Sequence, residues 1–173
     1  MAKLVPLNHP ALHTIAEEVT KEDFESGLVE KVVKDLRKAI KTYDVDGYTA
    51  VAIAAPQIGV SKRIFIIEDQ SKDEGRLPSI VAINPAFVKV SKKSHEVAEG
   101  CLSIPDTYGI VRRHTNVTMR ATDENGQMYV RGAGGLLAQI MQHESDHLDG
   151  ILFTDRAEKI WHKDNPPSGV EMT

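Results

Sequence analysis

The sequence LLAQIMQHESDHLDG at residues 136–150 sets the most specific expectation about the fold of this chain. Its apolar residues recur at helical spacing, which predicts a helix reaching to Gly150, a residue type favoured just beyond a helix end. Inside that helix His143 and His147 share one face, so both imidazoles can reach a single metal ion, with Glu144 beside them. This HExxH pattern predicts a metal centre. A catalytic centre of this kind also needs a third protein ligand and an open position for water.

The third ligand distinguishes classes of metal-dependent hydrolase. One class of zinc endopeptidase has a further histidine where this chain has Phe153, and another takes a glutamate from a later helix. Here the later glutamates are Glu158, which follows His147 closely in the sequence, and Glu171, near the C-terminus. Neither is a good ligand. Upstream, Cys101 carries the only thiol of the chain in the glycine-containing segment 99–103, which we expect to be a loop. Thiolate is a strong ligand for a borderline-soft divalent ion, although by itself this residue would more often be a buried, inert cysteine.

The rest of the sequence predicts an α+β fold. Apolar residues at three- and four-residue spacing predict an N-terminal amphipathic helix over residues 28–43. Apolar and β-branched runs predict strands over residues 63–68, 80–83 and 86–90. Residues 117–122 and 127–131 predict a hairpin, with Asn125-Gly126 forming a type I′ turn. We therefore expect short antiparallel strands and hairpins packed around a central HExxH-bearing helix.

Composition limits the class of protein. The chain has 173 residues, 41% of them hydrophobic and 27% charged, which predicts one globular domain over residues 1–164 and a frayed tail over 165–173. A net charge of −4 predicts no direct nucleic-acid binding, and no apolar run reaches bilayer length. The first residues lack a secretory signal, and a single cysteine suits a reducing compartment, so the expected location is the cytoplasm.

Three motifs in order resemble those of the peptide deformylase family, which are GxGxAAxQ, EGCLS and QHExDH. This chain has AVAIAAPQ at residues 50–57, EGCLS at 99–103 and QHESDH at 142–147. The second and third motifs match fully, and the flanking residues are also similar over most of the chain. The resemblance implies a metal-dependent hydrolase that removes the N-formyl group from the N-terminal methionine of newly made proteins and releases formate.

The resemblance also implies roles for individual residues. Cys101, His143 and His147 would hold one divalent metal ion, and Glu144 would transfer protons, a role worth about 10² to 10⁴ in rate. The Gln57 side-chain amide and the Leu102 backbone N–H would stabilise the oxyanion that forms at the formyl carbon. Losing one such donor typically lowers the rate by roughly 10² to 10³. The residues expected to contact substrate are Val51, Ala52 and Gly100. Glu99 and Asp146 either orient the ligating histidines or are surface carboxylates, whereas His9, His13, His95, His114 and His162 are expected to face solvent.

Two features depart from the family pattern. Alanines occupy both glycine positions of the first motif, at Ala50 and Ala52, unless Gly47 takes the first role across a short insertion. This segment lies along the bound peptide in the family, so the alanines bring substrate handling into question. Some members also carry a basic C-terminal helix that docks on the ribosome. Here Lys159 and Lys163 are offset by neighbouring acids, so proximity to the ribosome is expected without that docking helix.

The identity of the metal depends on which argument is followed. Ligand softness favours Zn(2+) for one thiolate and two imidazoles. The family resemblance favours Fe(2+) in the cell, with Zn(2+), Ni(2+) or Co(2+) as replacements. The alternative functions are a deformylase-like protein with low activity or altered substrate preference, one that binds formylated peptides without turnover, and a zinc endopeptidase. A purely structural metal site is disfavoured because three protein ligands leave one position open.

Overall fold

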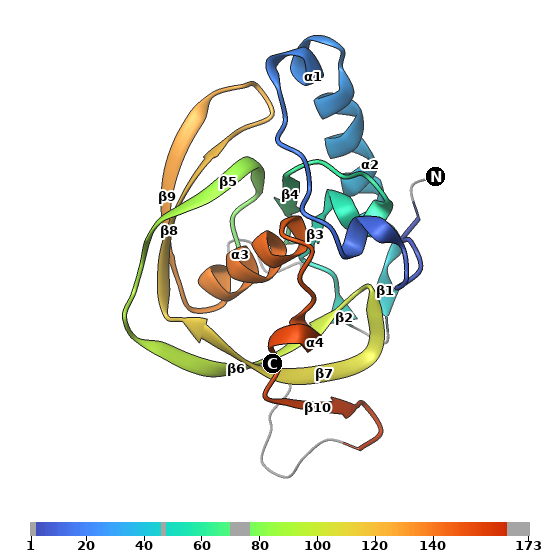
Figure 1. The fold of residues 1–173 in the computed structure, drawn as a ribbon, viewed down its shortest axis with the longest axis vertical. Coiled ribbons are helices and arrows are strands. Elements are labelled where there is room, and N and C mark those ends of the chain that lie inside the picture. Colours follow the sequence, from blue (N-terminus) through green and yellow to red (C-terminus); the bar gives the residue numbers. More distant parts are fainter. Residues whose placement is uncertain (1–2, 46–47, 70–76, 166–173) are drawn as a thin grey trace.

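The computed structural model describes residues 3–45, 48–69 and 77–165 (Figure 1). Its helices, in chain order, are the 3₁₀ turn η1 (Pro10–Leu12), α1 (Lys21–Glu25), α2 (Leu28–Thr42), the 3₁₀ turn η2 (Ala55–Ile58), α3 (Gly135–Leu148) and α4 (Phe153–Arg156). Gly47 and almost all of the expected tail, residues 166–173, lie outside the described residues. In the part of the chain that is described, no helix has the length and hydropathy needed to cross a membrane.

The strands form antiparallel sheets, as expected for the α+β class. The five-stranded sheet has the order β3-β4-β5-β8-β9, with β3 Ala52–Ala54, β4 Ile64–Ile67, β5 Ile80–Val90, β8 Asn116–Thr122 and β9 Met128–Gly134. The three-stranded sheet has the order β10-β7-β6, with β6 Ser94–Cys101, β7 Ile104–His114 and β10 Lys159–His162. A small pair joins β1 (Asp44–Val45) to β2 (Tyr48–Thr49). Both β3 and β6 are edge strands of their sheets.

Helices cover both faces of strand β4. The continuous apolar sequence of β4 follows from this, because a strand buried on both faces has no polar side to alternate with. Ile64 and Ile66 belong to the cluster formed with α2, whereas Phe65 and Ile67 belong to the cluster formed with α3. All four side chains are fully buried, which contributes about 1.5 to 3 kcal/mol each. In Figure 1, α2 and α3 accordingly lie on opposite sides of β4.

The predicted amphipathic helix is confirmed as α2. Its buried face consists of Val29, Val32, Val33, Leu36, Ala39 and Ile40, and it ends at Thr42 with Tyr43 as the following residue. Helix α3 packs its own apolar residues, among them Ala138, Met141 and Leu148, against Phe65 and Met119. Gly150, with φ 70°, follows the end of α3 in the left-handed region that glycine tolerates.

The two short strands expected over residues 80–83 and 86–90 are one strand, β5. Asn84-Pro85 resembles a turn signal in the sequence, but the chain continues through it with a register shift against β8 between Ile83 and Ala86. Asn84 has φ 49°, and its side chain accepts from the Val19 N–H and donates to the Val19 carbonyl, both at 2.8 Å. The Asn84 backbone N–H still donates to the Arg63 carbonyl at 2.9 Å, and the two side-chain bonds fix the irregular position to Val19.

The predicted hairpin is confirmed as β8 and β9, but the type I′ turn is wrong. Such a turn needs positive φ at both central residues, and of Asn125-Gly126 only Gly126 has one, at 80°. Instead the Gly126 N–H donates to the Asp123 carbonyl, and the Asp123 carboxylate accepts from the N–H groups of Asn125 and Gln127. Asp123 thus stabilises a longer loop that closes with a left-handed glycine.

Candidate metal centre

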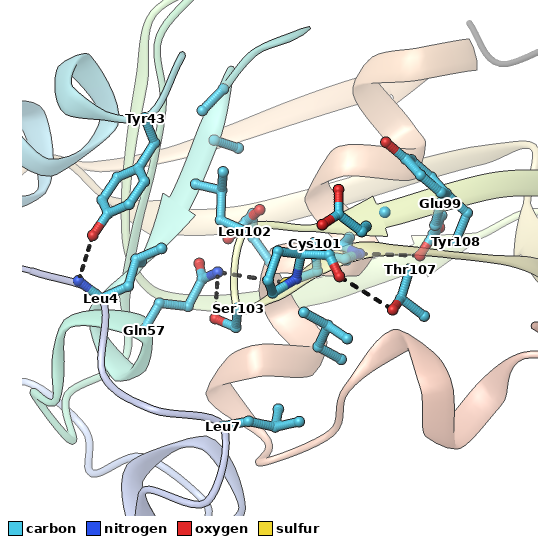
Figure 2. Close-up of a pocket in the computed structure, with 18 of the residues that line it drawn as sticks. Leu4, Leu7, Tyr43, Gln57, Glu99, Cys101, Leu102, Ser103, Thr107 and Tyr108 are labelled. Carbon is cyan, nitrogen blue, oxygen red and sulfur yellow. Dashed lines mark hydrogen bonds and ion pairs between the residues drawn. The ribbon is translucent and has the colours of Figure 1, made fainter. Parts of the chain in front are cut away.

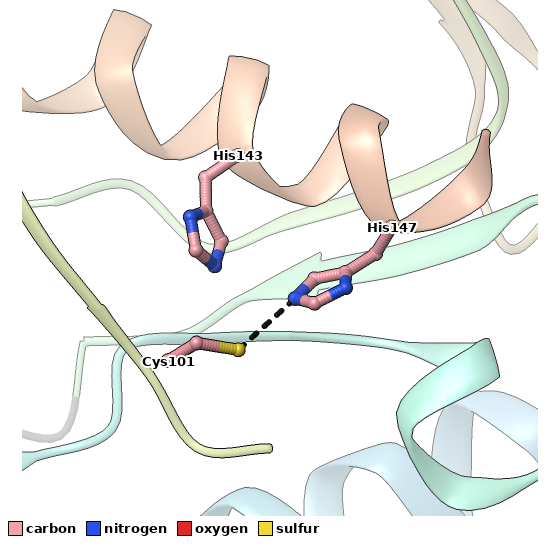
Figure 3. Close-up of side chains that lie close together, drawn as sticks. All are labelled: Cys101, His143 and His147. Atoms are coloured by element: carbon pink, nitrogen blue, oxygen red, sulfur yellow. Dashed lines mark hydrogen bonds between the residues drawn. The ribbon is translucent and has the colours of Figure 1, made fainter. Parts of the chain in front are cut away.

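The three predicted metal ligands lie together. Helix α3 carries His143 and His147 one turn apart on a single face, and Cys101 is the last residue of strand β6 rather than part of a loop. Their ligand atoms all lie within 4.8 Å of one another, and Cys101 Sγ is 3.2 Å from His147 Nε2 (Figure 3). The two imidazole rings meet nearly edge to face, with 5.0 Å between their centres. One ion can therefore be reached by all three side chains.

The electrostatics of this cluster suit a cation. Burial alone would raise the pKa of the Cys101 thiol, but His147 and His143 beside it outweigh burial and hold that pKa well below its usual range. Burial likewise opposes protonation of His143, yet Cys101 and Glu99 raise the pKa of His143 well above its usual value. Thiolate is the form of cysteine that binds metal, and an ion taking the place of the imidazolium proton would release that proton. One thiolate and two imidazoles are therefore a donor set that fits a divalent ion.

Glu144 lies in the same buried region, next to His143 in α3. Burial raises its pKa to about 7, although His143 and His147 lower it in part. Its Oε2 atom has no hydrogen-bond partner among the described residues. A buried carboxylate oxygen without a partner is costly for the fold, and such groups in native structures commonly have a chemical role.

Glu99 and Asp146 are both buried, so the alternative that they are surface carboxylates is wrong. Glu99 Oε2 lies 3.0 Å from His143 Nδ1, which leaves His143 Nε2 to face the cluster. Burial opposes ionisation of Glu99, but hydrogen bonds from Arg113 and His143 outweigh it and lower the pKa of Glu99 to about 2. Asp146 bonds instead to Arg113 and Arg156, with 2.6 Å from its Oδ2 to Arg113 Nη1.

Arg113, the residue of β7 that joins Glu99 to Asp146, was not predicted from the sequence. Its guanidinium donates twice to Glu99, at 2.7 and 2.8 Å, and once to Asp146. A possible signal was present, because Val111 and Arg113 are two residues apart and so face the same side of a strand. Val111 is fully buried and Arg113 is 4% exposed. That signal needed β7 to be recognised as a strand first.

Gln57, in the 3₁₀ turn η2, lies next to Cys101 (Figure 2). Its Oε1 accepts from the Ala54 N–H at 2.8 Å, so its Nε2 group points the other way. Nε2 lies 3.1 Å from Ser103 Oγ and 3.5 Å from Cys101 Sγ. Ser103 is a second buried residue of the site that sequence analysis did not single out.

One cleft of about 810 Å³ is lined by several residues of this site, namely Gln57, Glu99, Cys101, Ser103, His143 and Glu144. Val51 and Ala52 form part of one wall beside edge strand β3, and Gly100, Leu102 and their neighbours form another beside edge strand β6. Ala50 also lines the cleft, and residues 4–7 of the N-terminal segment contribute an apolar wall. The Leu4 N–H donates to the hydroxyl of Tyr43 at 3.0 Å, which ties this segment to the end of α2 (Figure 2).

Gly100 is constrained by a neighbour within the three-stranded sheet. It pairs with Tyr108 across β6 and β7, and a Cβ atom at position 100 would lie 2.9 Å from the Tyr108 ring. Glycine at this position therefore allows the ring to cover the strand that ends in Cys101. Tyr108 in turn stacks on Trp161 of β10, with 6.2 Å between ring centres.

The other histidines are outside the cluster. His13, His114 and His162 are exposed, as expected, whereas His9 and His95 are half-buried, so that expectation is wrong for these two. His9 accepts a hydrogen bond from the Ala11 N–H in the N-terminal segment.

Comparisons with known proteins identify the family of this chain. The sequence model of the polypeptide deformylase family matches residues 1–163. Peptide deformylase 2 of Gloeobacter violaceus is 39% identical over 151 residues, which cover 86% of this chain and 79% of that protein. Among solved structures, a peptide deformylase from Synechococcus elongatus in complex with actinonin has a TM-score of 0.76 and 33% identity, covering 90% of this chain and 78% of that one. A Met-Ala-Ser-bound class I type b peptide deformylase from Acinetobacter baumannii has a TM-score of 0.79 and 29% identity, covering 90% of this chain and 99% of that one. With a match over nearly its whole length, the chain belongs to the peptide deformylase family.

Proposed function

We propose that this chain is a metal-dependent hydrolase that removes the N-formyl group from the N-terminal methionine of newly made proteins. The observation that carries the proposal is the close approach of the half-buried Cys101 and His143 to the buried His147, with an unpartnered carboxylate oxygen of Glu144 in the same region. Membership of the peptide deformylase family supports the reaction type.

Cys101, His143 and His147 would hold one divalent metal ion. When bound, the ion polarises a carbonyl group and lowers the pKa of water toward neutrality. We propose Fe(2+) as the ion in the cell, with Zn(2+), Ni(2+) or Co(2+) as replacements, because the family favours iron while a thiolate with two imidazoles accepts all four. Three protein ligands leave a position open for reactants, which a purely structural site would not.

Glu144 would move the protons of the reaction. Its carboxylate takes a proton from the attacking water, whose oxygen forms a bond to the formyl carbon. When the bond between carbon and nitrogen breaks, the same group returns a proton to the leaving amine, so the products are formate and a free amino terminus. Such proton transfer contributes about 10² to 10⁴ in rate. The position of Glu144 supports this role, because this buried residue lines the cleft in which the substrate would lie.

Gln57 and Leu102 would stabilise the negative charge that develops on the formyl oxygen. Support for Gln57 comes from the Ala54 N–H, which fixes the side-chain amide so that its N–H groups face Cys101. Leu102 lies in the turn between β6 and β7, directly after Cys101, and lines the cleft. Donors fixed before the reaction pay no reorganisation cost as the charge develops.

The cleft suits an extended peptide. It lies between edge strands β3 and β6, and edge strands have backbone groups that can pair with an added strand. Val51, Ala52 and Gly100 would contact the peptide main chain there. Binding of the tripeptide Met-Ala-Ser by the Acinetobacter baumannii relative supports formylmethionyl nascent peptides as the substrate class.

Further parts of the proposal concern the whole chain. We propose that residues 1–164 form one functional domain in which α3 is the central scaffold, supported by its packing against β3, β4, β7, β8 and β9. A cytoplasmic location suits a functional thiol at Cys101. Proximity to the ribosome follows from the nascent substrate. Within the described residues the chain after α3 has only α4 and β10, so no long basic helix supports docking there.

The test is formate release from formyl-Met-Ala-Ser by protein reconstituted anaerobically with Fe(2+). We expect turnover that requires both the ion and Glu144, no release of acetate from acetyl-Met-Ala-Ser, and no digestion of casein. Casein digestion without formate release would favour an endopeptidase. Tight binding of formyl-Met-Ala-Ser without formate release by the metal-loaded protein would instead identify a binding protein.

A further inference from the structure

Arg113 occupies the middle of a buried chain of charges that begins at the metal centre. The chain runs from His143 through Glu99, Arg113 and Asp146 to Arg156, and each link is a hydrogen bond or ion pair of 3.0 Å or less. The side chains of Glu99, Arg113 and Asp146 are 2%, 4% and 10% exposed, whereas Arg156 at the far end is 45% exposed. The order of burial shows that the inner members are held inside the protein and only the last one faces solvent.

We propose that Arg113 is a positioning residue for the metal centre, acting through Glu99 to fix the ring of His143. The inference rests on the metal-binding part of the proposed function, and on this chain's own contacts. Arg113 contacts none of the three metal ligands through a described hydrogen bond, so its effect on them passes through Glu99.

The guanidinium determines how Glu99 is oriented. Arg113 Nε donates to Oε1 and Nη2 donates to Oε2, a two-point contact that fixes the plane of the carboxylate. Oε2 is also the atom that accepts from His143 Nδ1. Because Nδ1 carries the proton in that bond, Nε2 is left as the lone-pair donor of His143. A cation with a single donating point would leave the carboxylate free to rotate about its own bond, and the ring would lose its fixed direction.

Arg113 also connects the two parts of the chain that carry the ligands. Glu99 lies on β6, two residues before Cys101, and Asp146 lies on α3, next to His147. One planar group on β7 thus bridges the strand and the helix, because its third donor, Nη1, reaches Asp146. The distance between the thiolate and the imidazoles therefore depends on this bridge, and so does the affinity for the ion.

The neighbouring Arg112 provides a matched control. It lies on the opposite face of β7, is 54% exposed, and pairs with Glu96 at 2.8 Å and Glu158 at 3.3 Å. Arg112→Lys and Arg113→Lys make the same chemical change at adjacent positions. Both keep the positive charge and remove the planar fork, so a difference between them reports the buried contacts.

The experiment measures Co(2+) affinity by competition with a chelator, together with the absorption spectrum of the Co(2+)-loaded protein and its thermal unfolding. For Arg113→Lys we expect affinity roughly 10- to 100-fold below that of the unchanged protein, and an altered thiolate-to-cobalt absorption band. Arg112→Lys should leave both unchanged. A purely structural Arg113 would lower the melting temperature while leaving affinity and spectrum as they were, and that result would overturn the proposal. Equal effects of both variants would overturn it too.

A second variant keeps the test decisive if Arg113→Lys does not fold. Asp146→Asn removes one charged partner of the guanidinium while leaving Glu99 and the three ligands in place. We expect a smaller but measurable loss of Co(2+) affinity, about 3- to 10-fold, because Asp146 reaches Glu99 only through Arg113, whereas losing a direct partner of a metal ligand typically costs roughly 10- to 100-fold. Unchanged affinity in this variant would overturn the proposal. None of these measurements uses formyl-peptide turnover. If the proposed reaction is wrong, the protein will release no formate, but its metal binding can still depend on Arg113. The two proposals can therefore fail separately.

Discussion

The backbone N–H of Ala54 donates a hydrogen bond to the side-chain oxygen of Gln57, with 2.8 Å between the two atoms. This contact decides which end of the Gln57 amide faces the metal centre. A backbone N–H can only donate, so the amide oxygen must turn toward it and the NH₂ group must turn toward Cys101 and Ser103. The side chain is therefore oriented before any substrate is bound.

The first prediction concerns Gln57→Glu. A carboxylate would still accept from Ala54, but its second oxygen would replace a donor with a negative charge beside the thiolate. We expect kcat/KM for formyl-Met-Ala-Ser to fall by roughly 10² to 10³, with the bound metal retained. Steady-state kinetics and metal analysis measure both quantities. Gln127→Glu, an exposed change in the hairpin loop, is the control, and near-normal turnover of Gln57→Glu would refute the assigned role.

Glu144→Gln should separate proton transfer from metal binding. The amide keeps the shape of the side chain and adds no charge, so the ion should remain bound. We expect kcat to fall by about 10² to 10⁴ because no group is left to carry the proton. Metal content measured beside activity tests this, with the exposed Glu96→Gln as control. Retained turnover with metal bound would show that another group moves the proton.

Removing any one ligand should instead release the ion. Cys101→Ala, His143→Ala and His147→Ala each leave two protein ligands of the three that lie within 4.8 Å of one another. We expect each variant to lose both metal and activity during dialysis against a chelator that the unchanged protein withstands. His162→Ala, at an exposed histidine outside the cluster, should behave like the unchanged protein. A variant that kept its ion would identify a residue that is not a ligand.

Sequence patterns predicted the elements whose burial follows a simple period. Helix α2 has one apolar face, and β4 is apolar throughout because helices cover both of its faces. In β8, buried residues alternate with more exposed ones. The sequence of each element therefore indicates which of its faces are buried. Strands β6 and β7 were not predicted. Their residues are half-buried and often polar, because they surround a cleft and pair mainly with each other. Strand identity there depends on tertiary pairing, which local sequence does not contain.

The residues of the candidate site that belong to a motif could be predicted from the sequence. Residues from elsewhere in the chain that hydrogen-bond to them, such as Arg113, could not. HExxH places two candidate ligands on one helix by geometry alone, and the second motif identified the single cysteine as the third candidate. Arg112 and Arg113 are indistinguishable as letters, yet one is exposed and paired at the surface while the other is buried between two carboxylates. Strand alternation separates them only after β7 has been recognised as a strand with one face packed toward α3.

Exposure to air should distinguish the metals. Iron with an open coordination position beside a thiolate can react with oxygen, whereas zinc has no redox chemistry. We expect the Fe(2+) form to lose activity in air and to be protected by anaerobic handling, while the Zn(2+) and Ni(2+) forms keep theirs. Activity is followed over hours in air and under nitrogen for each metal form. An iron form that is stable in air for hours would contradict this.

The last prediction concerns Ala52, where this chain has alanine in place of the glycine of the family motif. Ala52 opens edge strand β3, pairs with Ile67 and lines the cleft, so its Cβ adds bulk to the wall along which we expect the substrate main chain to lie. Any Cβ there occupies space that a close backbone approach needs, and misplacement by about 1 Å can lower rates 10²-fold. We expect Ala52→Gly to raise kcat/KM for formyl-Met-Ala-Ser.

The same change should lower stability, because Ala52 packs in part against the core cluster of α3 and because glycine raises the entropy of the unfolded chain. A loss of about 0.5 to 1 kcal/mol in the free energy of unfolding is expected. Ala86→Gly, at an exposed position of β5 outside the cleft, should reproduce a loss of stability without a gain in kcat/KM. Ala50→Gly tests the other glycine position, where the methyl group packs against the α2 cluster as well as lining the cleft. If neither Ala50→Gly nor Ala52→Gly raises kcat/KM, the alanines do not crowd the substrate, and the backbone of residues 50–52 already leaves the room that the family obtains with glycine.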